Sequence, residues 1–220
     1  MIISVERRDV IRRVAGLIPA LQNGACARVA VDGPDASGKT MFANELAAEV
    51  QASGRPVVRV SLDDFHNPRA IRYQYGRESP EGYWQHAFNY PRFRSDVLEP
   101  FRPGGTRLHR PAAHDLATDA PLDPEPLTAA PAAVLIVDGL FLQRDELVTA
   151  WDLSVFLDVP FAETARRMAM RDGTDPDPAH PSIRRYVEAQ RIYFEACTPH
   201  DRADVHIDNQ DLNAPRIIRP

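Results

Sequence analysis

Two spacings of hydrophobic residues alternate along this chain of 220 residues, and together they predict its secondary structure. Apolar residues at helical spacing predict helices at about 4–22, from the loop after residue 38 to about 53, from after Pro91 to Phe101, and at about 161–171 and 182–196. Short apolar runs predict strands at 27–32, 57–62, 132–137, 153–157 and 203–207. Alternating strands and helices favour an open α/β fold with a mostly parallel sheet.

The segments between these elements differ in character. The strand predicted at 132–137, AAVLIV, is almost entirely apolar, which is typical of a strand buried on both faces of a parallel sheet. Periodicity fades from 67 to 89, where aromatic, Arg and His residues dominate, and the tail after residue 211 has none. Residues 111–131 hold five prolines, which favour a surface loop. No internal repeat is visible. A length of 220 residues is typical of one α/β domain, so we expect 1–220 to form a single domain, with two small domains as the alternative.

Charge and composition narrow the classes of partner. The net charge of −5 gives no reason to expect nucleic-acid binding, and no apolar run approaches the roughly 18 residues of a membrane helix. The first residues, MIISVERRDVIRR, lack the apolar segment of a signal peptide. Cys26 and Cys197 match no metal or redox spacing. We therefore expect a cytoplasmic protein without nucleic-acid or membrane partners, and whether it forms a homo-oligomer is left open.

One glycine-rich stretch carries specific chemistry. Residues 33–40, GPDASGKT, match G-x-x-x-x-G-K-[ST] and lie between a predicted strand and a predicted helix. Such a loop turns its backbone N–H groups toward phosphates, its Lys reaches the β- and γ-phosphates, and its Thr hydroxyl faces Mg²⁺. The predicted ATP-binding residues are Gly33, Asp35, Ala36, Ser37, Gly38, Lys39 and Thr40. Lys39 is also the only Lys among 26 basic residues, which indicates a position that Arg does not fill. The alternative is a glycine turn with a surface Lys.

Two acidic residues follow predicted strands. Asp138 ends the apolar run at 132–137, where an acid helps to hold Mg²⁺ beside Thr40; alternatively, Asp138 only caps a turn. Asp63 directly follows the strand at 57–62. A carboxylate there would lie near the phosphate loop, could accept a hydroxyl proton and could touch the metal.

Longer stretches resemble the uridine kinase branch of the P-loop small-molecule kinases over about 27–209. The matching segments are SLDDFHN (61–67), VLIVDGLFL (134–142), LSVFLDVPFAETARRMAMRDG (153–173) and ADVHIDN (203–209). The resemblance implies a P-loop three-layer fold with a helical lid at about 166–185, and ATP and Mg²⁺ as cofactors. It implies that Asp63 is the catalytic base, with Asp64 as its neighbour or a group behind the metal, and that Asp138 replaces the usual Glu.

The resemblance also assigns the lid arginines. Arg167 and Arg171 fall at or near the positions that clamp the phosphates, and Arg166 is out by one position. Arg167 and Arg171 are four residues apart and share one face of a helix. Alternatively, these cations only complement the negative end of the helix dipole.

The acceptor site matches the family less closely. We expect it in insertions at about 67–92 and 107–131, and the candidate substrate-binding residues are Tyr83, Trp84, His86, Arg110 and His114. The family's Tyr and His that contact the base have no full counterpart, because RLHRPAAHDLATDA (107–120) contains no Tyr. The aromatic residues at 83–86 could instead form a core cluster. Most of the arginines at 69, 72 and 77 fit a solvated face, and their density is also compatible with an acceptor that bears a phosphate or a carboxylate.

The predicted function is ATP- and Mg²⁺-dependent phosphorylation of a hydroxyl of a small molecule, with the 5′-hydroxyl of uridine or cytidine as the family default. Two alternatives stay open. One is a kinase of the same fold with another acceptor, such as pantothenate or a sugar phosphate. The other is a nucleotide-binding regulatory NTPase that transfers no phosphate.

Overall fold

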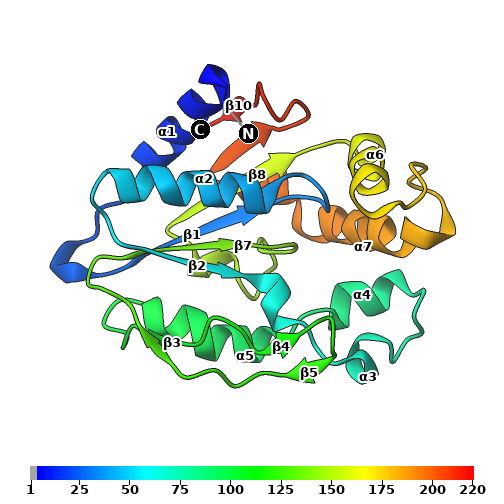
Figure 1. The fold of residues 1–220 in the computed structure, drawn as a ribbon, viewed down its shortest axis with the longest axis horizontal. Coiled ribbons are helices and arrows are strands. Elements are labelled where there is room, and N and C mark those ends of the chain that lie inside the picture. The colour runs from blue at the N-terminus through cyan, green and yellow to red at the C-terminus, as the bar shows by residue number, and fades with distance from the viewer. Residues whose placement is uncertain (1–3) are drawn as a thin grey trace.

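A six-stranded sheet forms the centre of the molecule, with helices on both faces (Figure 1). The structure is a computed structural model that describes residues 4–220, so residues 1–3 of the predicted domain lie outside it. The strands of the sheet are β1 (Ala27–Asp32), β2 (Val57–Ser61), β7 (Val134–Asp138), β8 (Leu153–Asp158), β9 (Val205–Asp208) and β10 (Arg216–Arg219). Their order is β10-β9-β8-β1-β7-β2, and only β10 runs antiparallel to its neighbour.

The register brings three strand ends to one level. Asp138 of β7 lies opposite Val31 of β1 and Ser61 of β2. The residues that follow β1 and β2 therefore leave the sheet at the edge where Asp138 ends β7. In open parallel sheets this carboxyl edge is where ligands bind.

Helices cover the sheet in two layers. They are α1 (Val5–Leu17), α2 (Lys39–Ala52), α3 (Arg69–Arg72), α4 (Pro80–His86), α5 (Tyr90–Phe93), α6 (Phe161–Asp172), α7 (Pro181–Cys197) and α8 (Pro199–Arg202). Helices α1 and α2 share one apolar core with β1, β7, β8 and β9, while α5 and α7 contribute to a second core that includes β2 and the opposite face of β1 and β7. Figure 1 shows α6 and α7 at the carboxyl end of the sheet, with α4 below α7. This arrangement confirms the predicted α/β fold with a mostly parallel sheet.

The structure adds elements that the hydrophobic pattern did not predict. These are helices α3 and α4, which lie within 67–89. The helix predicted from after Pro91 to Phe101 is present: it starts as α5 at Tyr90 and continues through a wider turn to Leu98 and a tighter one to Phe101. Ser79 and Asn89 cap α4 and α5 by accepting backbone hydrogen bonds from Gly82 (3.0 Å) and Arg92 (3.0 Å). Caps of this kind stabilise helices too short to show an apolar period.

The proline-rich segment and the tail also form strands. Strands β3 (Leu108–His109) and β6 (Leu127–Thr128) pair with each other, as do β4 (His114–Asp115) and β5 (Ala120–Pro121). The tail forms β10, which pairs with β9 although its residues are largely exposed. An exposed edge strand needs no apolar run, so the hydrophobic pattern did not predict it.

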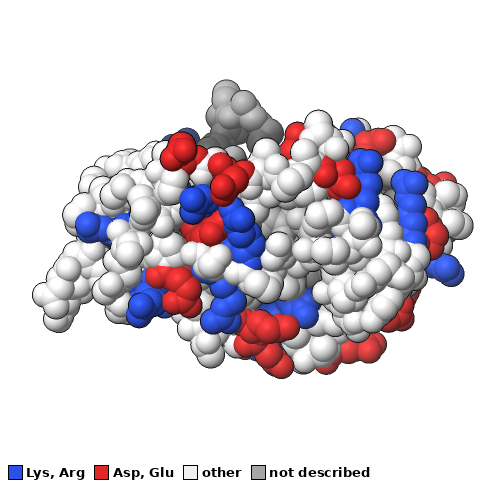
Figure 2. Space-filling model, turned by 90° about the horizontal axis from the view of Figure 1, so that it is seen from below, with Lys and Arg blue, Asp and Glu red and all other residues white. Residues whose placement is uncertain are grey.

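The lower layer carries mixed charge. Figure 2 shows acidic and basic side chains beside one another across this face. Asp123, for example, pairs with Arg92 at 2.8 Å and with Arg110 at 3.2 Å. Within residues 4–220, no helix combines the length and apolar character that a membrane crossing requires.

Candidate functional site

The phosphate-loop motif connects β1 to α2, as its pattern requires. Gly33 has φ +153°, and a Cβ there would lie 2.6 Å from the backbone oxygen of Leu157. Gly38 has φ +91° and lies against the side chains of Leu212 and Asn209. Both positions need glycine, because the backbone takes conformations that other residues rarely adopt and leaves no room for a side chain.

Two polar side chains of the loop, Lys39 and Ser37, have hydrogen-bonding capacity that a ligand could use. The ammonium nitrogen of Lys39 donates to the backbone oxygens of Gly33 (2.9 Å) and Pro34 (2.7 Å). The Ser37 hydroxyl is buried and has no hydrogen-bond partner among residues 4–220. A buried polar group without a partner is rare in proteins. The loop therefore contains a cation and a hydroxyl whose hydrogen-bonding capacity suits a phosphate.

Asp138 lies next to the loop and is held on both of its oxygens. The Thr40 hydroxyl donates to Oδ2 of Asp138 at 2.6 Å, and Nη2 of Arg59 lies 2.6 Å from Oδ1. Arg59, on β2, also donates to the backbone oxygen of Ile136 at 2.6 Å. Arg59 therefore fixes the orientation of the carboxylate that faces Thr40. The oxygen donors of Thr40 and Asp138 are the kind of ligand that Mg²⁺ prefers.

Asp63 follows β2 on the same edge of the sheet. The residue is exposed to solvent, yet the surrounding protein raises the pKa of its carboxyl above the ordinary value. The Lys39 ammonium opposes this rise, and the Asp138 carboxylate adds to it. Burial likewise raises the pKa of Asp64, and the nearby carboxylates add to that rise. Carboxylates raise one another's pKa in this way only when they lie near each other, so these carboxyl groups are neighbours beside the phosphate loop.

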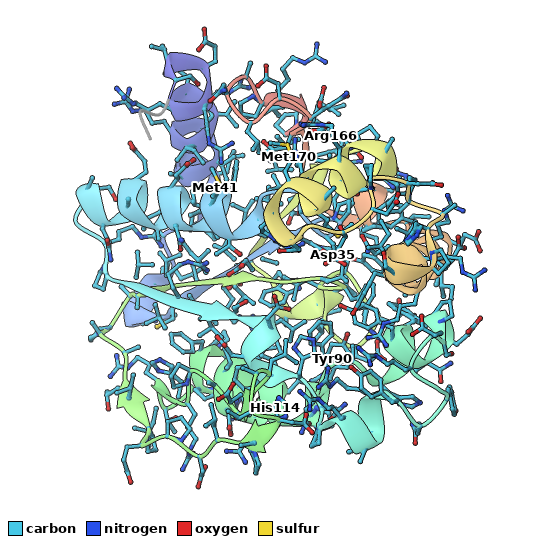
Figure 3. All side chains as sticks on the ribbon, turned by 45° about the vertical axis from the view of Figure 1, so that its right-hand side comes forward. Asp35, Met41, Tyr90, His114, Arg166 and Met170 are labelled. Carbon is cyan, nitrogen blue, oxygen red and sulfur yellow. The ribbon has the colours of Figure 1, made fainter. Side chains whose placement is uncertain are left out.

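Asp35 extends the site toward α7. Gln190 of α7 accepts a hydrogen bond from the backbone N–H of Asp35 (2.9 Å) and donates to Oδ2 of Asp35 (3.0 Å). Burial raises the pKa of the Asp35 carboxyl, and Asp63 adds to the rise. In Figure 3, Asp35 lies beneath α6 and above the layer that carries Tyr90 and His114. Asp35 therefore lies between the lid helix and the layer formed by the two insertions.

A buried carboxylate that the sequence analysis did not single out supports the loop from below. Asp32 accepts hydrogen bonds from the backbone N–H groups of Gly33 (2.7 Å) and Gln143 (3.2 Å), and from the hydroxyl of Tyr193. Burial raises the pKa of Asp32 to about 6. This network ties the start of the loop to α7 and to the segment after β7.

The predicted lid arginines have different surroundings. Arg167 pairs with Glu163 at 2.9 Å and donates to the backbone oxygens of Ala36 (3.2 Å) and Gln210 (2.8 Å), so it links the lid helix to the phosphate loop. Arg171 is exposed and pairs only with its neighbour Asp172 among the described residues.

Arg171 nevertheless faces the phosphate-loop side of the lid. Its charge lowers the pKa of both Asp35 and Asp63, which opposes the effect of their burial. Arg166 pairs with Glu163 (2.7 Å), and Figure 3 labels it on the side of α6 away from Asp35. Of Arg167 and Arg171, Arg171 is therefore the one whose guanidinium is not already bonded to the phosphate loop.

The predicted acceptor-site residues do not all gather in one place. Tyr83 lies near Asp35 and Asp63, because both carboxylates help to raise its pKa. Trp84 instead packs on Phe141 with ring centres 4.8 Å apart, and the Arg144 guanidinium lies 3.9 Å from the Trp84 ring centre. Trp84 thus belongs to the aromatic core cluster that the sequence left as the alternative.

The other acceptor-site candidates also have defined neighbours. The His86 ring meets Tyr75 edge-on at 4.9 Å. Arg110 pairs with Asp123 in the lower layer. His114 is buried, with Nε2 3.3 Å from Asp119. Tyr83 is thus the candidate whose pKa Asp63 affects, and all five assignments remain predictions.

His66 also lies beside Asp63, although the sequence analysis gave it no role. Burial lowers the pKa of His66 to about 4, so the ring is neutral at pH 7. Its Nδ1 lies 2.7 Å from the backbone oxygen of Asp63, which can only accept, so Nδ1 carries the proton. Nε2 is then a hydrogen-bond acceptor.

A cavity of about 950 Å³ lies between α6 and the segment 208–216. It adjoins the phosphate loop, because Leu212 contacts Gly38 and the Asn209 side chain donates to the backbone oxygen of Ser37 at 2.7 Å. Arg7 of α1 holds this segment from behind by donating to the backbone oxygen of Leu212 at 2.9 Å. The cavity lies where a ligand on the loop could extend past the lid.

Comparison with known proteins identifies the fold. No protein-family model and no curated protein sequence matches the chain. Among solved structures, a possible uridine kinase from Bacillus stearothermophilus matches with 24% identity and a TM-score of 0.69, over 91% of this chain and 96% of that one. A protein provisionally assigned as a fructose transport system kinase, from Silicibacter sp. TM1040, matches with 23% identity and a TM-score of 0.68, over 91% and 98%.

A more distant structure has the same architecture. The D-glycerate 3-kinase of Cryptococcus neoformans matches over 95% of this chain and 99% of its own, with 12% identity and a TM-score of 0.60. At these identities the likeness concerns the fold. The chain therefore has the α/β fold of these kinases, and its predicted resemblance to the uridine kinase branch is confirmed at the level of the fold.

Proposed function

We propose that the protein is an ATP- and Mg²⁺-dependent phosphotransferase that moves the γ-phosphoryl group to a hydroxyl of a small molecule. One observation carries the proposal: the Lys39 ammonium, the bonded pair Thr40 and Asp138, and the Asp63 carboxylate meet at one edge of the sheet. Phosphoryl transfer requires this combination of phosphate cradle, metal-side oxygens and base.

The nucleotide would occupy the loop and the cavity beside it. Lys39 would exchange its two backbone oxygens for phosphate oxygens, and Arg171 would meet the phosphates from the lid. Arg167 would act by holding the lid against the loop, since its donors already reach backbone oxygens there. The cavity between α6 and 208–216 suits the nucleoside part of ATP.

Thr40 and Asp138 would hold Mg²⁺, with Asp63 on its open side. When bound, the ion would neutralise charge on the β- and γ-phosphates. Asp63 would accept the proton of the attacking hydroxyl. Its raised pKa brings the carboxyl closer to the pH at which proton transfer is most effective.

The hypothesis that the acceptor is a nucleoside rests on the family resemblance. Tyr83, beside Asp63, could stack on a ring, and the neutral His66 could accept a hydrogen bond from one. Uridine and cytidine are therefore the first acceptors to test, with pantothenate and ribulose 5-phosphate as representatives of the other acceptor class.

The test measures ADP formation with an enzyme-linked assay. Each reaction contains ATP, Mg²⁺ and one of the candidate acceptors. The proposal predicts ADP formation that depends on one of the acceptors and stops when EDTA removes the metal. ATP hydrolysis that no acceptor accelerates would contradict it and would favour the regulatory NTPase.

A further inference from the structure

Arg185 of α7 is a buried cation without an acidic partner. Its side chain donates through Nη1 to the backbone oxygen of Arg77, and only 7% of the residue is exposed. Its Nε is buried and has no hydrogen-bond partner among residues 4–220. Burying a charge without a counter-charge is costly, so such a group is rarely present without a reason.

The other buried arginines show the usual arrangement. Arg7 lies 2.6 Å from Glu45, Arg72 lies 3.1 Å from Asp119, and Arg144 lies 3.1 Å from Glu146. Each of these guanidinium groups has a carboxylate within contact distance. Arg185 departs from this pattern, because no carboxylate of the described residues lies within contact distance of its guanidinium. A bound anion could supply the counter-charge.

Aromatic rings hold the Arg185 guanidinium in place. Its central carbon lies 4.5 Å from the ring centre of Tyr186 and 5.2 Å from those of Tyr73 and Tyr83. We call these rings and Arg185 the tyrosine cage. Cation–π contacts offset part of the cost of burial and fix the plane of the fork, but they supply no acceptor for the Nε–H group, and the one acceptor of Nη1 is an uncharged backbone oxygen.

The tyrosine cage adjoins the proposed site of transfer. The Arg185 guanidinium lies 5.2 Å from the Tyr83 ring centre, and Asp35 is bonded to Gln190 on the same helix as Arg185. The carboxylates of Asp35 and Asp63 also raise the pKa of Tyr83. Tyr73 and Tyr83 come from the insertion expected to bind the acceptor, and Figure 1 shows α4 lying against α7 at the carboxyl end of the sheet. A molecule with a hydroxyl at Asp63 could therefore extend past Tyr83 to Arg185.

We propose that Arg185 recognises an anionic group on the acceptor, so that the substrate is a hydroxyl compound bearing a carboxylate or a phosphate. A guanidinium fork pairs with either group through two parallel N–H donors. The ligand would supply the acidic partner that the fold does not provide. Its role as the acceptor rests on the proposed phosphotransferase function, and it narrows that function away from neutral nucleosides.

The arginines that the sequence drew attention to are engaged elsewhere. Arg69 and Arg72 both contact Asp119, at 4.0 and 3.1 Å, and Arg72 also donates to the backbone oxygen of Asn67. Arg77 contributes its backbone oxygen to Arg185. The anion site therefore centres on Arg185, 108 positions after Arg77.

The test is calorimetric titration of the protein loaded with Mg²⁺ and the non-hydrolysable analogue AMP-PNP, which occupies the phosphate loop. Inorganic phosphate, pantothenate and uridine are the probes, so phosphate and carboxylate are distinguished from a neutral nucleoside. We expect at least one anion to bind, and Arg185→Gln to weaken that binding at least about tenfold, as loss of a charge-assisted contact implies. Arg184→Gln, an exposed neighbour on α7, should bind as the wild type does.

Three results would overturn the inference: a wild type that binds neither anion, anion binding that Arg185→Gln leaves unchanged, or an equal loss of uridine binding. If Arg185→Gln does not fold by circular dichroism, Arg185→Lys decides. It keeps the charge without the fork and should bind the anion at least about threefold more weakly than the wild type; wild-type binding would then overturn the inference. No turnover is measured, so failure of the kinase assay and failure of this titration are distinct results.

Discussion

Replacing the buried carboxylate of Asp32 by an amide should change how stability depends on pH. The Asp32 carboxyl is fully buried beneath the phosphate loop, and burial raises its pKa from the ordinary 3.8 to about 6. Since the folded protein holds this proton more tightly than the unfolded chain does, ionisation of Asp32 works against folding. The cost is absent below about pH 4 and complete above about pH 6.

The size of the effect follows from the shift. At about 1.4 kcal/mol per pKa unit, the rise from 3.8 to about 6 corresponds to about 3 kcal/mol. Part of this cost already exists at pH 5, so about 1 kcal/mol remains to develop between pH 5 and pH 7. Asp32→Asn cannot ionise. Its stability relative to the wild type should therefore increase by about 1 kcal/mol over that range, whatever constant offset the altered hydrogen bonds with Tyr193 and Gln143 introduce.

Urea unfolding followed by circular dichroism at pH 5, 6 and 7 measures this difference. Asp9→Asn is the matched control, because it makes the same change of side chain at an exposed position on α1, outside the buried network. A stability difference between Asp32→Asn and the wild type that stays constant from pH 5 to pH 7 would refute the reasoning. A difference that decreases with pH would show that Asp32 is stabilised as the anion.

Three further predictions concern the loop and the base. Lys39→Arg should weaken nucleotide binding at least about tenfold in a titration with a fluorescent ATP analogue, because the ammonium fits between the Gly33 and Pro34 oxygens at 2.9 and 2.7 Å and a guanidinium is larger. Gly33→Ala should lower the free energy of unfolding by at least about 2 kcal/mol in urea, since its Cβ would meet the Leu157 oxygen at 2.6 Å. The acceptor kcat/KM should fall on acidification through a pKa above the ordinary 3.8, because the ionised form of Asp63 accepts the proton and burial raises its pKa.

Each of these has a result that would count against it. Wild-type affinity in Lys39→Arg would mean that the loop accepts any cation. Gly16→Ala, where a Cβ meets nothing within 4 Å, is the control for Gly33→Ala, and equal stabilities of the two variants would remove the steric argument. A rate that stays constant down to the ordinary pKa would separate the shift of Asp63 from catalysis.

The parts of the fold that the sequence predicted are those with a local signal. The apolar runs of β1 and β7 predict strands at those same residues, and the glycine pattern at 33–40 predicts the loop at its own position. Elements with weak local signals were missed: α4 depends on the Ser79 cap, and β10 on pairing with β9. The Ser-Pro and Asn-Tyr-Pro signals before α4 and α5 could have been used, since such residues mark helix starts.

In the site, too, residues with a local sequence signal could be predicted, and residues brought together by packing could not. Positions at or just after the end of a strand, such as Asp138 and Asp63, could be predicted because parallel strands end at one edge of the sheet. Asp32 also ends a strand, and that signal could have drawn attention to it. The bond between Asp35 and Gln190, 155 positions apart, could not be predicted, and neither could the tyrosine cage around Arg185. Both join residues from distant parts of the chain that only the packing of α7 brings together.

Transfer of the γ-phosphoryl group by Asp63→Asn tests the central claim most directly. The assay measures radiolabelled product from γ-labelled ATP and the best acceptor of the panel, with ATP affinity determined separately and Asp9→Asn as the control. We predict that Asp63→Asn binds ATP with nearly wild-type affinity and transfers phosphate at least about a hundredfold more slowly, since the hydroxyl proton has lost its acceptor. Near-wild-type transfer by this variant would contradict the assignment of Asp63 as the base and, with it, the proposed mechanism of phosphoryl transfer.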